Sequence, residues 1–474
     1  MHWAIGGGAL LSRRLLRGQG VGSSPTVAPF QVSLPKLPFL QPDQQDESTD
    51  YYNLTLQSSE VEIIPGFRTN VWGFNGLYPG PTIIAKAGRA VAITQTNGLN
   101  TQACVHLHGG HTPADSDGHP VDLFDPGTSK RYTYPNNQAA GTLWYHDHAV
   151  GETARNVYMG LAGFYLISDP AEAALNLPSG DYDVPIMIQD KSFQPDGSLY
   201  YPGSDFRVAH FGFSGDTMVV NGAVQPYLHV VSRKYRLRLL NASNASDYSL
   251  QLQTSGSGTV VPFIQIGSDG ELLPAPVLRT SLSISPGERA DVVVDFSAVP
   301  ITSSVVMING SADSVRLRQV MRFDVVDTAL DDSTVGPILK PIDPLPVAQA
   351  AQHREIVLSF DGRRLAWVLN GKPFDAARVD FQPALNSVEV WTWINRSGMV
   401  HPMHLHNVQV QVLSRGSAAP PVWETGWKDT VPVNPGESVS VITRFTDYTG
   451  LYVFHCHKLE HEDHDMMGQF EVAG

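Results

Sequence analysis

The amino-acid sequence predicts an all-β protein of three β-sandwich domains in tandem. With 474 residues, the chain is roughly three times as long as a domain of about 150 residues. Its 42 glycines and 34 prolines, with little helical periodicity, indicate short strands joined by many turns. An Asn-Gly turn that leads to an alternating strand begins at Asn75, Asn221 and Asn370, at intervals of 146 and 149 residues. This spacing indicates one repeat per domain.

Each repeat contains a strand in which apolar and polar residues alternate or nearly alternate, the pattern of a half-buried strand. These strands are Val91–Thr94, Tyr235–Leu239 and Val388–Trp393. A second repeated pattern occurs in the last two repeats. Pro-Gly-Glu occurs at 286–288 and at 435–437, and a phenylalanine follows nine residues after each glycine. Either repeated pattern alone could be coincidence, whereas both together support three tandem sandwiches.

The repeats and the composition set the expected boundaries. Residues 1–50 are expected to be a flexible leader, because residues 41–50 are polar and acidic. Within the leader, Ser12-Arg13-Arg14 hints at a degenerate twin-arginine export signal, but no apolar stretch follows the arginines. Residues 331–352 contain four prolines and are expected to be a stiff linker. The three domains are then 51–170, 171–330 and 353–474.

The composition excludes several classes of function. Lys and Arg number 32 against 46 Asp and Glu, and this net charge of −14 argues against nucleic acid or anionic lipid as the main partner. No uninterrupted apolar run reaches membrane-spanning length. The two cysteines, Cys104 and Cys456, are too few for a disulfide framework or for a zinc site of several thiolates. Cys104 is expected to be a buried free thiol.

The histidines carry the functional signal. Ten of the 17 lie in four short segments, two in the first domain and two in the third. Residues i and i+2 of a strand point to the same face, so each His-x-His pair directs two imidazoles to one place. Eight such imidazoles exceed the four ligands of a zinc site and predict a polynuclear metal centre between the first and third domains. The pairs are His106 and His108, His146 and His148, His404 and His406, and His455 and His457.

Cys456 lies between the last two histidines, so its thiol points to the opposite face of the strand and needs other partners. His401 and His461 are left over by the pairing, and Met466 is close enough in sequence to fold back. Two histidines, one cysteine and a methionine form the ligand set of a blue-copper electron-transfer site. We therefore predict a single copper on one face of the strand and the polynuclear centre on the other.

Alternative interpretations of these segments are weaker. One His-x-His pair alone could be an ordinary pair of surface or core histidines. Cys456 could be a catalytic nucleophile, but no Asn or Asp is placed to complete a protease-like set. Four clusters together favour a metal protein over both alternatives.

The four histidine segments resemble the copper signatures of the multicopper oxidases, and most closely those of three-domain members such as bacterial spore-coat laccases, bilirubin oxidases and copper-efflux oxidases. The resemblance runs from about Tyr51 to Gly474 and includes residues 78–82 (YPGPT), 115–118 (DSDG) and 426–430 (GWKDT). It implies three cupredoxin-like Greek-key β-sandwich domains and four coppers per chain: one type 1, one type 2 and a type 3 pair. The middle domain would hold no copper and would keep the outer two in register.

The resemblance also implies which residues bind copper. Type 1 copper would take His401, Cys456, His461 and the axial Met466, and type 2 copper would take His106 and His404. The type 3 pair would take six histidines, whose division between the two ions stays open: His108, His146, His148, His406, His455 and His457.

Two acidic residues are candidates for delivering protons to dioxygen. Asp117 and Glu462 match acidic residues that serve this role in related enzymes, and a carboxyl group of suitable pKa can do so. The alternatives are that Asp117 is an ordinary turn residue in Ser-Asp-Gly and that Glu462 is a solvated loop charge.

The activity implied by the resemblance is a copper oxidase, laccase-like or bilirubin-oxidase-like. It would couple four one-electron oxidations of a phenolic or aromatic-amine donor to the reduction of dioxygen to two waters, with electrons entering at the imidazole edge of His461 or His401. The alternatives are a cuprous oxidase for copper tolerance, disfavoured because the 10 methionines form no rich insert, and a coat or envelope assembly protein.

The expected partners are dioxygen and small aromatic donors, without nucleic acid or a membrane span, and a monomer is expected. The resemblance favours an exported protein or one on a spore or cell surface, although the leader lacks a convincing apolar segment. Other residues carry weaker expectations. His111, His119 and His464 are interpreted as loop or surface histidines. His210, His229 and His353 carry no signal, and Trp423 and Trp427 could wall the donor site or simply pack.

Overall fold

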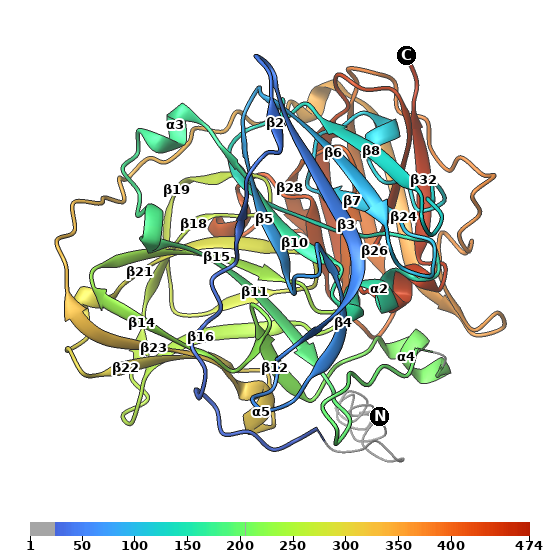
Figure 1. Ribbon diagram of the computed structural model, residues 1–474. Coiled ribbons are helices and arrows are strands. Elements are labelled where there is room, and N and C mark those ends of the chain that lie inside the picture. Colours follow the sequence, from blue (N-terminus) through green and yellow to red (C-terminus); the bar gives the residue numbers. More distant parts are fainter. Residues whose placement is uncertain (1–23, 204) are drawn as a thin grey trace, which may run out of the picture.

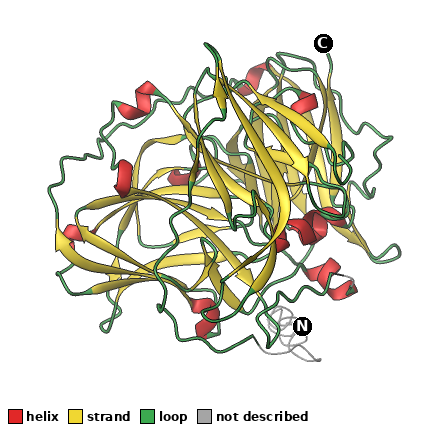
Figure 2. Cartoon of the chain, viewed as in Figure 1, coloured by secondary structure: helices red, strands yellow, loops and turns green. Residues whose placement is uncertain are grey.

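The computed structural model describes residues 24–203 and 205–474. Their strands form six β-sheets, which are arranged as three sandwiches (Figures 1 and 2). The all-β class predicted from the sequence is confirmed. Each sandwich encloses one large apolar core to which both of its sheets contribute. The twin-arginine hint lies in residues 1–23, outside the described residues.

The first sandwich positions the first two histidine segments. Alternating residues of its longest strand, such as Tyr52, Leu54 and Leu56, are buried against Leu143 and Tyr145 of the opposite sheet. One sheet has the order β1 (Phe39–Leu40), β5 (Gly80–Lys86), β10 (Ala162–Ser168), β9 (Gly141–Asp147) and β7 (Val105–His108). The other has the order β2 (Gln44–Gln45), β3 (Thr49–Val61), β6 (Ala90–Asn97) and β8 (Ser129–Tyr134), with β4 (Thr69–Phe74) paired to β3.

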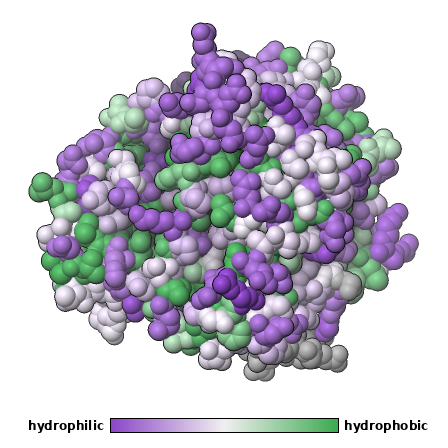
Figure 3. All heavy atoms as spheres, viewed as in Figure 1, coloured by the Kyte–Doolittle hydropathy of each residue, from purple (hydrophilic) through white to green (hydrophobic). Residues whose placement is uncertain are grey.

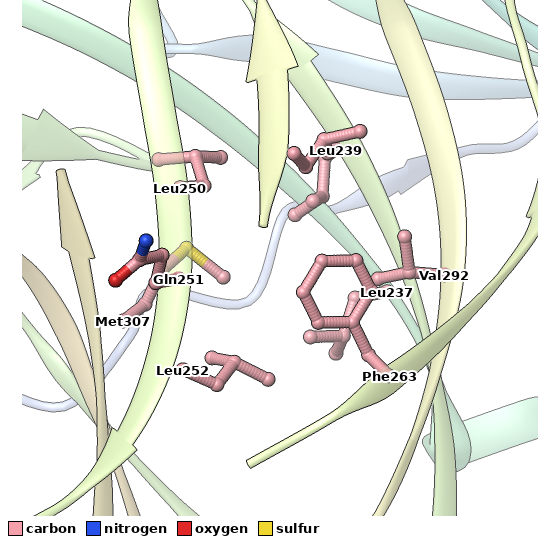
Figure 4. A pocket seen from close by; sticks show the side chains of 9 residues that line it. Leu237, Leu239, Leu250, Gln251, Leu252, Phe263, Val292 and Met307 are labelled. Atoms are coloured by element: carbon pink, nitrogen blue, oxygen red, sulfur yellow. The ribbon is translucent and has the colours of Figure 1, made fainter. Parts of the chain in front are cut away.

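The second sandwich contains no histidine pair. Its two sheets meet across a small pocket, apolar apart from Gln251, in which Leu239 and Phe263 face Leu250 and Leu252 (Figure 4). One sheet runs β13 (Ala223–Val224), β12 (Thr217–Val220), β11 (Asp183–Lys191), β15 (Lys234–Asn241), β21 (Arg289–Asp295), β18 (Phe263–Gly267) and β19 (Leu272–Arg279). The other runs β14 (Tyr227–Ser232), β23 (Gln319–Thr328), β22 (Ser304–Asn309), β16 (Tyr248–Thr254) and β17 (Val260–Val261), with β20 (Leu282–Ile284) paired to β16.

The third sandwich holds the last two histidine segments. Trp391, Met403 and Cys456 belong to its core. One sheet runs β25 (Ala366–Leu369), β24 (Ala350–Asp361), β26 (Val388–Asn395), β30 (Ser438–Arg444) and β28 (Val410–Arg415). The other runs β29 (Thr430–Val433), β27 (His401–Leu405), β31 (Gly450–Cys456) and β32 (Met467–Val472).

The repeat seen in the sequence is also a structural repeat. Both residues of each Asn-Gly pair, at 75–76, 221–222 and 370–371, have positive φ, which two-residue hairpin turns require. The flanking residues pair across each turn, and the three strands predicted from the sequence form β6, β15 and β26.

Short helices join the strands, and none in the described part of the chain is long and apolar enough to span a membrane. The α-helices are α2 (Thr153–Met159), α3 (Pro170–Ala173), α4 (Phe206–Phe211), α5 (Val315–Arg318) and α6 (Leu459–Asp463). The 3₁₀ helices are η1 (Ala114–Ser116), η2 (Gly180–Tyr182), η3 (Phe296–Ala298), η4 (Val347–Gln349) and η5 (Val422–Glu424). Helix α6, from the third sandwich, packs against α2 of the first and α4 of the second.

The expectation of a flexible leader to residue 50 is wrong for residues 24–50. Leu34 is buried in the core of the second sandwich, and β1 adds a parallel strand to β5 of the first. This segment therefore runs across two sandwiches (Figure 1) because its apolar residues are removed from water there. In the predicted linker, Leu339 is buried against Leu272 of the second sandwich, and β24 begins at Ala350.

Candidate metal centres

Strand register brings the four predicted histidine pairs together. In the first sandwich β7 pairs with β9, which places His106 opposite His146. In the third sandwich β27 pairs with β31, which places His404 opposite His455. The two strand pairs face each other, and imidazole rings stack across the junction, with centroids 3.7 Å apart for His108 and His404. All eight paired histidines are buried at this junction.

Several overlapping groups of these histidines have potential ligand atoms that lie within 4.8 Å of one another. One group is His108, His146 and His457, and another is His148, His406 and His455. Between them, the Nε2 atoms of His106 and His404 face each other at 3.4 Å. His108 also forms such a group with His106 and His404, so the groups overlap, and the division that the sequence left open stays a proposal.

The second ring nitrogen of most of these histidines is anchored, which fixes ring orientation and tautomer. His106 Nδ1 donates to the carbonyl oxygen of Asp117 at 2.6 Å, and His406 Nδ1 donates to Asp117 Oδ2 at 2.7 Å. Glu462 places Oε1 3.3 Å from His148 Nδ1 and Oε2 3.1 Å from His455 Nδ1. Both predicted carboxylates therefore lie one imidazole ring away from the centre of the cluster.

Asp429 was not predicted as a site residue, yet it anchors two histidines. Its Oδ1 accepts from His108 Nε2 at 2.9 Å, and its carbonyl oxygen accepts from His404 Nδ1 at 2.9 Å. The only signal in the sequence was its place in the segment 426–430, to which no role had been assigned.

The chemistry of the cluster fits copper. Burial lowers the pKa of His146 to about 3 and that of His148 to about 4, so these imidazoles are neutral at pH 7 and keep a lone pair for a metal. His146 Nε2 is buried without a hydrogen-bond partner among the described residues. Such a buried nitrogen is costly unless a metal or another donor satisfies it, and imidazole is a good ligand for copper.

Cys456 lies on the other face of β31, as predicted from the strand period. Its Sγ is 3.4 Å from His401 Nδ1 and 3.6 Å from His461 Nδ1. Met466 is buried in the same core, and its carbonyl oxygen accepts from the Cys456 N–H at 3.1 Å. Burial raises the pKa of the Cys456 thiol to about 12, and a coordinating metal deprotonates such a thiol. This set also fits copper.

His461 is not at the surface, contrary to the expectation that its ring edge meets the donor. Its exposed fraction is 0 %, and its Nε2 donates to the carbonyl oxygen of His210 at 3.1 Å. Trp367 donates to the same carbonyl from Nε1 at 3.1 Å, and its ring centroid is 4.7 Å from those of both His401 and His461. Helix α4 and Trp367 therefore cover this centre.

Two residue interpretations change as a result. His210, which carried no signal in the sequence, lies over the cysteine centre because the loop between β11 and β12 folds across the third sandwich. The tryptophan that contacts His461 is Trp367, whereas Trp423 lies beside Arg279 of the second sandwich.

Helix α6 connects the centres to all three sandwiches. Its Glu460 accepts from Asn244 Nδ2 of the second sandwich at 2.7 Å. Its Asp463 accepts from the main-chain N–H groups of Thr153 and Ala154 in the first sandwich, at 3.0 and 2.9 Å. Between these two residues lie His461 and Glu462, so one helical turn ties the cysteine centre to the histidine cluster.

The second sandwich contributes a buried arginine to the same junction. All five N–H groups of Arg289 donate hydrogen bonds, two of them to the carboxylate of Asp429, at 2.7 and 2.5 Å. The others go to main-chain carbonyls of Thr142, Gly287 and Asp269. Arg289 is therefore a residue through which the middle unit could hold the outer two in register.

The structure corrects the interpretation of His119, gives His111 two partners, and agrees with the prediction for Cys104. His119 is buried rather than solvated, because its loop folds under β7 and its carbonyl accepts from the Cys104 thiol at 3.3 Å. His111 joins two sandwiches, with Nδ1 2.8 Å from the carbonyl oxygen of Asn407 and Nε2 2.8 Å from Asp447. Cys104 is buried and free, as predicted.

Comparison with known proteins identifies the family. Models described as multicopper oxidase match residues 55–172 and 346–474. A laccase of Bacillus stratosphericus is 38% identical, over 94% of this chain and 99% of its own. The chain belongs to the multicopper oxidase family. A bilirubin oxidase of Albifimbria verrucaria is 36% identical, over 95% of this chain and 82% of its own. A crystal structure of a laccase from Pediococcus acidilactici superposes with a TM-score of 0.87 at 33% identity, covering 96% of this chain and 95% of its own.

Membership of this family makes the chain a copper-dependent oxidase that uses dioxygen as electron acceptor. The family's complement is four coppers of types 1, 2 and 3, and the histidine groups described above could bind them. The resemblance recognised from the histidine segments is therefore confirmed, as is the three-sandwich cupredoxin-like fold.

Proposed function

We propose that this multicopper oxidase is a laccase-like enzyme that oxidises phenolic or aromatic-amine donors. The observation that carries the proposal is the covalent link between the two centres: Cys456 is bonded through the main chain to His455 and His457, which belong to different groups of the histidine cluster. When bound, the four coppers supply one-electron redox chemistry that couples four donor oxidations to the reduction of one dioxygen to two waters.

The geometry supports the following ligand sets. His401, Cys456, His461 and Met466 would hold type 1 copper, and His106 and His404 would hold type 2 copper. One type 3 ion would take His108, His146 and His457, and the other His148, His406 and His455.

Asp117 and Glu462 are proposed to pass protons to the cluster for the reduction of dioxygen. Asp117 Oδ2 receives the His406 hydrogen bond, while Oδ1 is buried without a hydrogen-bond partner among the described residues. Glu462 touches a histidine of the first sandwich and one of the third. Each carboxylate is close enough to the cluster to pass a proton toward it, and each also orients the imidazole that it contacts.

A cuprous oxidase is the second candidate, because the copper-efflux oxidases are among the enzymes that the histidine segments resemble. The composition of the segments that cover His461 argues against a cuprous oxidase. Residues 200–216 and 360–367, which include α4 and Trp367, contain neither methionine nor cysteine. Soft sulfur ligands are those that select cuprous ion, so the cover lacks the chemistry to capture this substrate.

Copper analysis of the purified protein, combined with oxygen uptake, tests the proposal. We expect four coppers per chain and oxygen uptake with phenols that exceeds the uptake with cuprous salt. Cys456→Ser should abolish the blue absorbance and most donor oxidation, while about three coppers stay bound at the histidine cluster. Blue absorbance that survived this substitution would show that the type 1 assignment is wrong.

A further inference from the structure

The surface above His461 is built from two segments that the ligand motifs do not include. One is helix α4, and the other is the hairpin of β24 and β25, whose turn consists of residues 362–365 (Figure 1). Phe360 and Trp367 are paired directly across this hairpin. The imidazole of His210 on α4 packs against both of these rings, with centroids 4.2 and 5.2 Å away. The two segments therefore form one continuous surface, which we term the aromatic cover.

The aromatic cover offers a site for a flat ring within reach of the cysteine centre. His210 is stacked on the indole of Trp367 at an interplanar angle of 9°, and that indole contacts His401 and His461. Phe206, with 47% of its surface exposed, stacks beside His210 at 5.9 Å, and Leu365 is 56% exposed on the hairpin turn. A planar aromatic donor would gain both burial and ring contacts on this surface.

The cover is also cationic, although the chain as a whole is acidic with a net charge of −14. Exposed arginines lie at Arg207 on α4 and at Arg363 and Arg364 on the hairpin turn. Arg207 is paired with Asp205 at 2.8 Å, and Arg364 with Asp361 at 2.9 Å. The Arg363 guanidinium has no carboxylate oxygen within 4.0 Å among the described residues, so one positive charge on the cover is unmatched.

We propose that the donors of this enzyme are anionic aromatics, phenols that carry a carboxylate, whose ring lies on Phe206 and His210 while the carboxylate pairs with Arg363. This inference rests on the proposed oxidase function and adds the substrate class. Arginine suits the role because its planar fork binds a carboxylate through two parallel hydrogen bonds. Each donor loses one electron and its phenolic proton to give a phenoxyl radical, and four such donors with one dioxygen give four radicals and two waters.

The test compares a donor with its own uncharged form. The probes are sinapic acid and methyl sinapate, which share the phenolic ring and differ in the carboxylate. We expect the copper-loaded enzyme to have the higher kcat/KM for the acid at low ionic strength, with a ratio that falls as salt screens the charge. Arg363→Glu should lower the acid-to-ester ratio about tenfold and leave kcat/KM for the ester within about twofold, and Arg363→Gln should give an intermediate ratio.

Arg444→Glu is the matched control. Arg444 is exposed on the same sheet, but it lies in register with Val388 and Ala350, at the opposite end of β24 from the hairpin turn. At about 3.3 Å per residue, it is roughly 35 Å from the cover. This variant makes the same change in net charge, so it should leave the acid-to-ester ratio unchanged.

Binding without turnover provides an independent measurement. Trimethoxycinnamate keeps the ring and the carboxylate but has no oxidisable hydroxyl, so its Kd for the copper-loaded enzyme can be measured by calorimetry. We expect Arg363→Glu to weaken it about tenfold, with the blue absorbance unchanged. Equal ratios in the wild type and Arg363→Glu, with equal Kd values, would overturn the substrate inference while the oxidase proposal stood. Copper-loaded protein that oxidised neither probe would instead overturn the proposed function.

Discussion

Replacing Arg289 with leucine should weaken both the folded state and the histidine cluster. The guanidinium joins the three sandwiches, since it binds Thr142 of the first, Gly287 and Asp269 of the second and Asp429 of the third. Leucine fills much of the volume but leaves the Asp429 carboxylate buried without its counter-ion. Removing one partner of a buried ion pair costs about 3–5 kcal/mol. We expect the free energy of unfolding of the copper-free protein to fall by about that amount.

The same substitution should lower copper occupancy, because Asp429 anchors His108 and His404. Loss of a hydrogen-bond partner behind a ligand reduces metal affinity by about 10- to 100-fold. The assay is urea denaturation of the copper-free protein, together with copper per chain after dialysis against limiting copper. Arg415→Leu is the control: Arg415 pairs with Glu424 and Glu437 within the third sandwich alone, so it should cost less stability and no copper.

A double variant separates the two effects. Arg289→Leu combined with Asp429→Leu removes both charges, so part of the lost stability should return. Copper should stay low, because His108 still lacks its acceptor. An Arg289→Leu protein with a free energy of unfolding within about 1 kcal/mol of the wild type and full copper would refute this reasoning.

Three further predictions concern the cluster itself. Glu462→Gln should slow oxygen uptake at saturating donor while the blue absorbance is kept; unchanged uptake would exclude a proton role for Glu462. Gly287→Ala should reduce copper at the histidine cluster, measured by elemental analysis, because a Cβ there would lie 2.9 Å from the His457 ring at a backbone φ of +86°; full copper would contradict the close contact. The third concerns pH. Burial holds the pKa of His146 at about 3 in the folded state against 6.5 when unfolded, so only the unfolded state takes up the proton between these values. The copper-free protein should therefore lose stability as pH falls from 6.5 toward 3, and His146→Gln should flatten the dependence of urea midpoints on pH.

The candidate ligand residues could be recognised in the sequence because each depends on local rules. The period of two in a strand places His455 and His457 on the face opposite Cys456, and the structure has this arrangement. The Asn-Gly turns were predictable for the same reason, since their positive φ values are a property of the two residues themselves.

The residues around the ligands could not be predicted, because their roles arise from contacts between distant segments. His210 is 251 residues from His461, and its main-chain carbonyl makes the contact, so no side-chain motif marks it. Arg289 is 140 residues from Asp429 and belongs to a sandwich without ligands. The prediction missed the order of residues 24–50 because it rested on the polar segment 41–50, whereas Leu34, which fastens the chain to the second sandwich, precedes that segment.

The distribution of ligands along the chain bears on when the metal can enter. The group of His108, the group of His148 and the cysteine centre all draw on the segment 455–461. Sandwiches generally fold in order as the chain leaves the ribosome. A nascent chain that has completed its first sandwich presents candidate ligands but no complete site. The three groups named above are completed almost at once, when the segment 455–461 docks. With the proposed ligand sets, copper loading would be a late step of biosynthesis, and the first two sandwiches would fold without help from the metal.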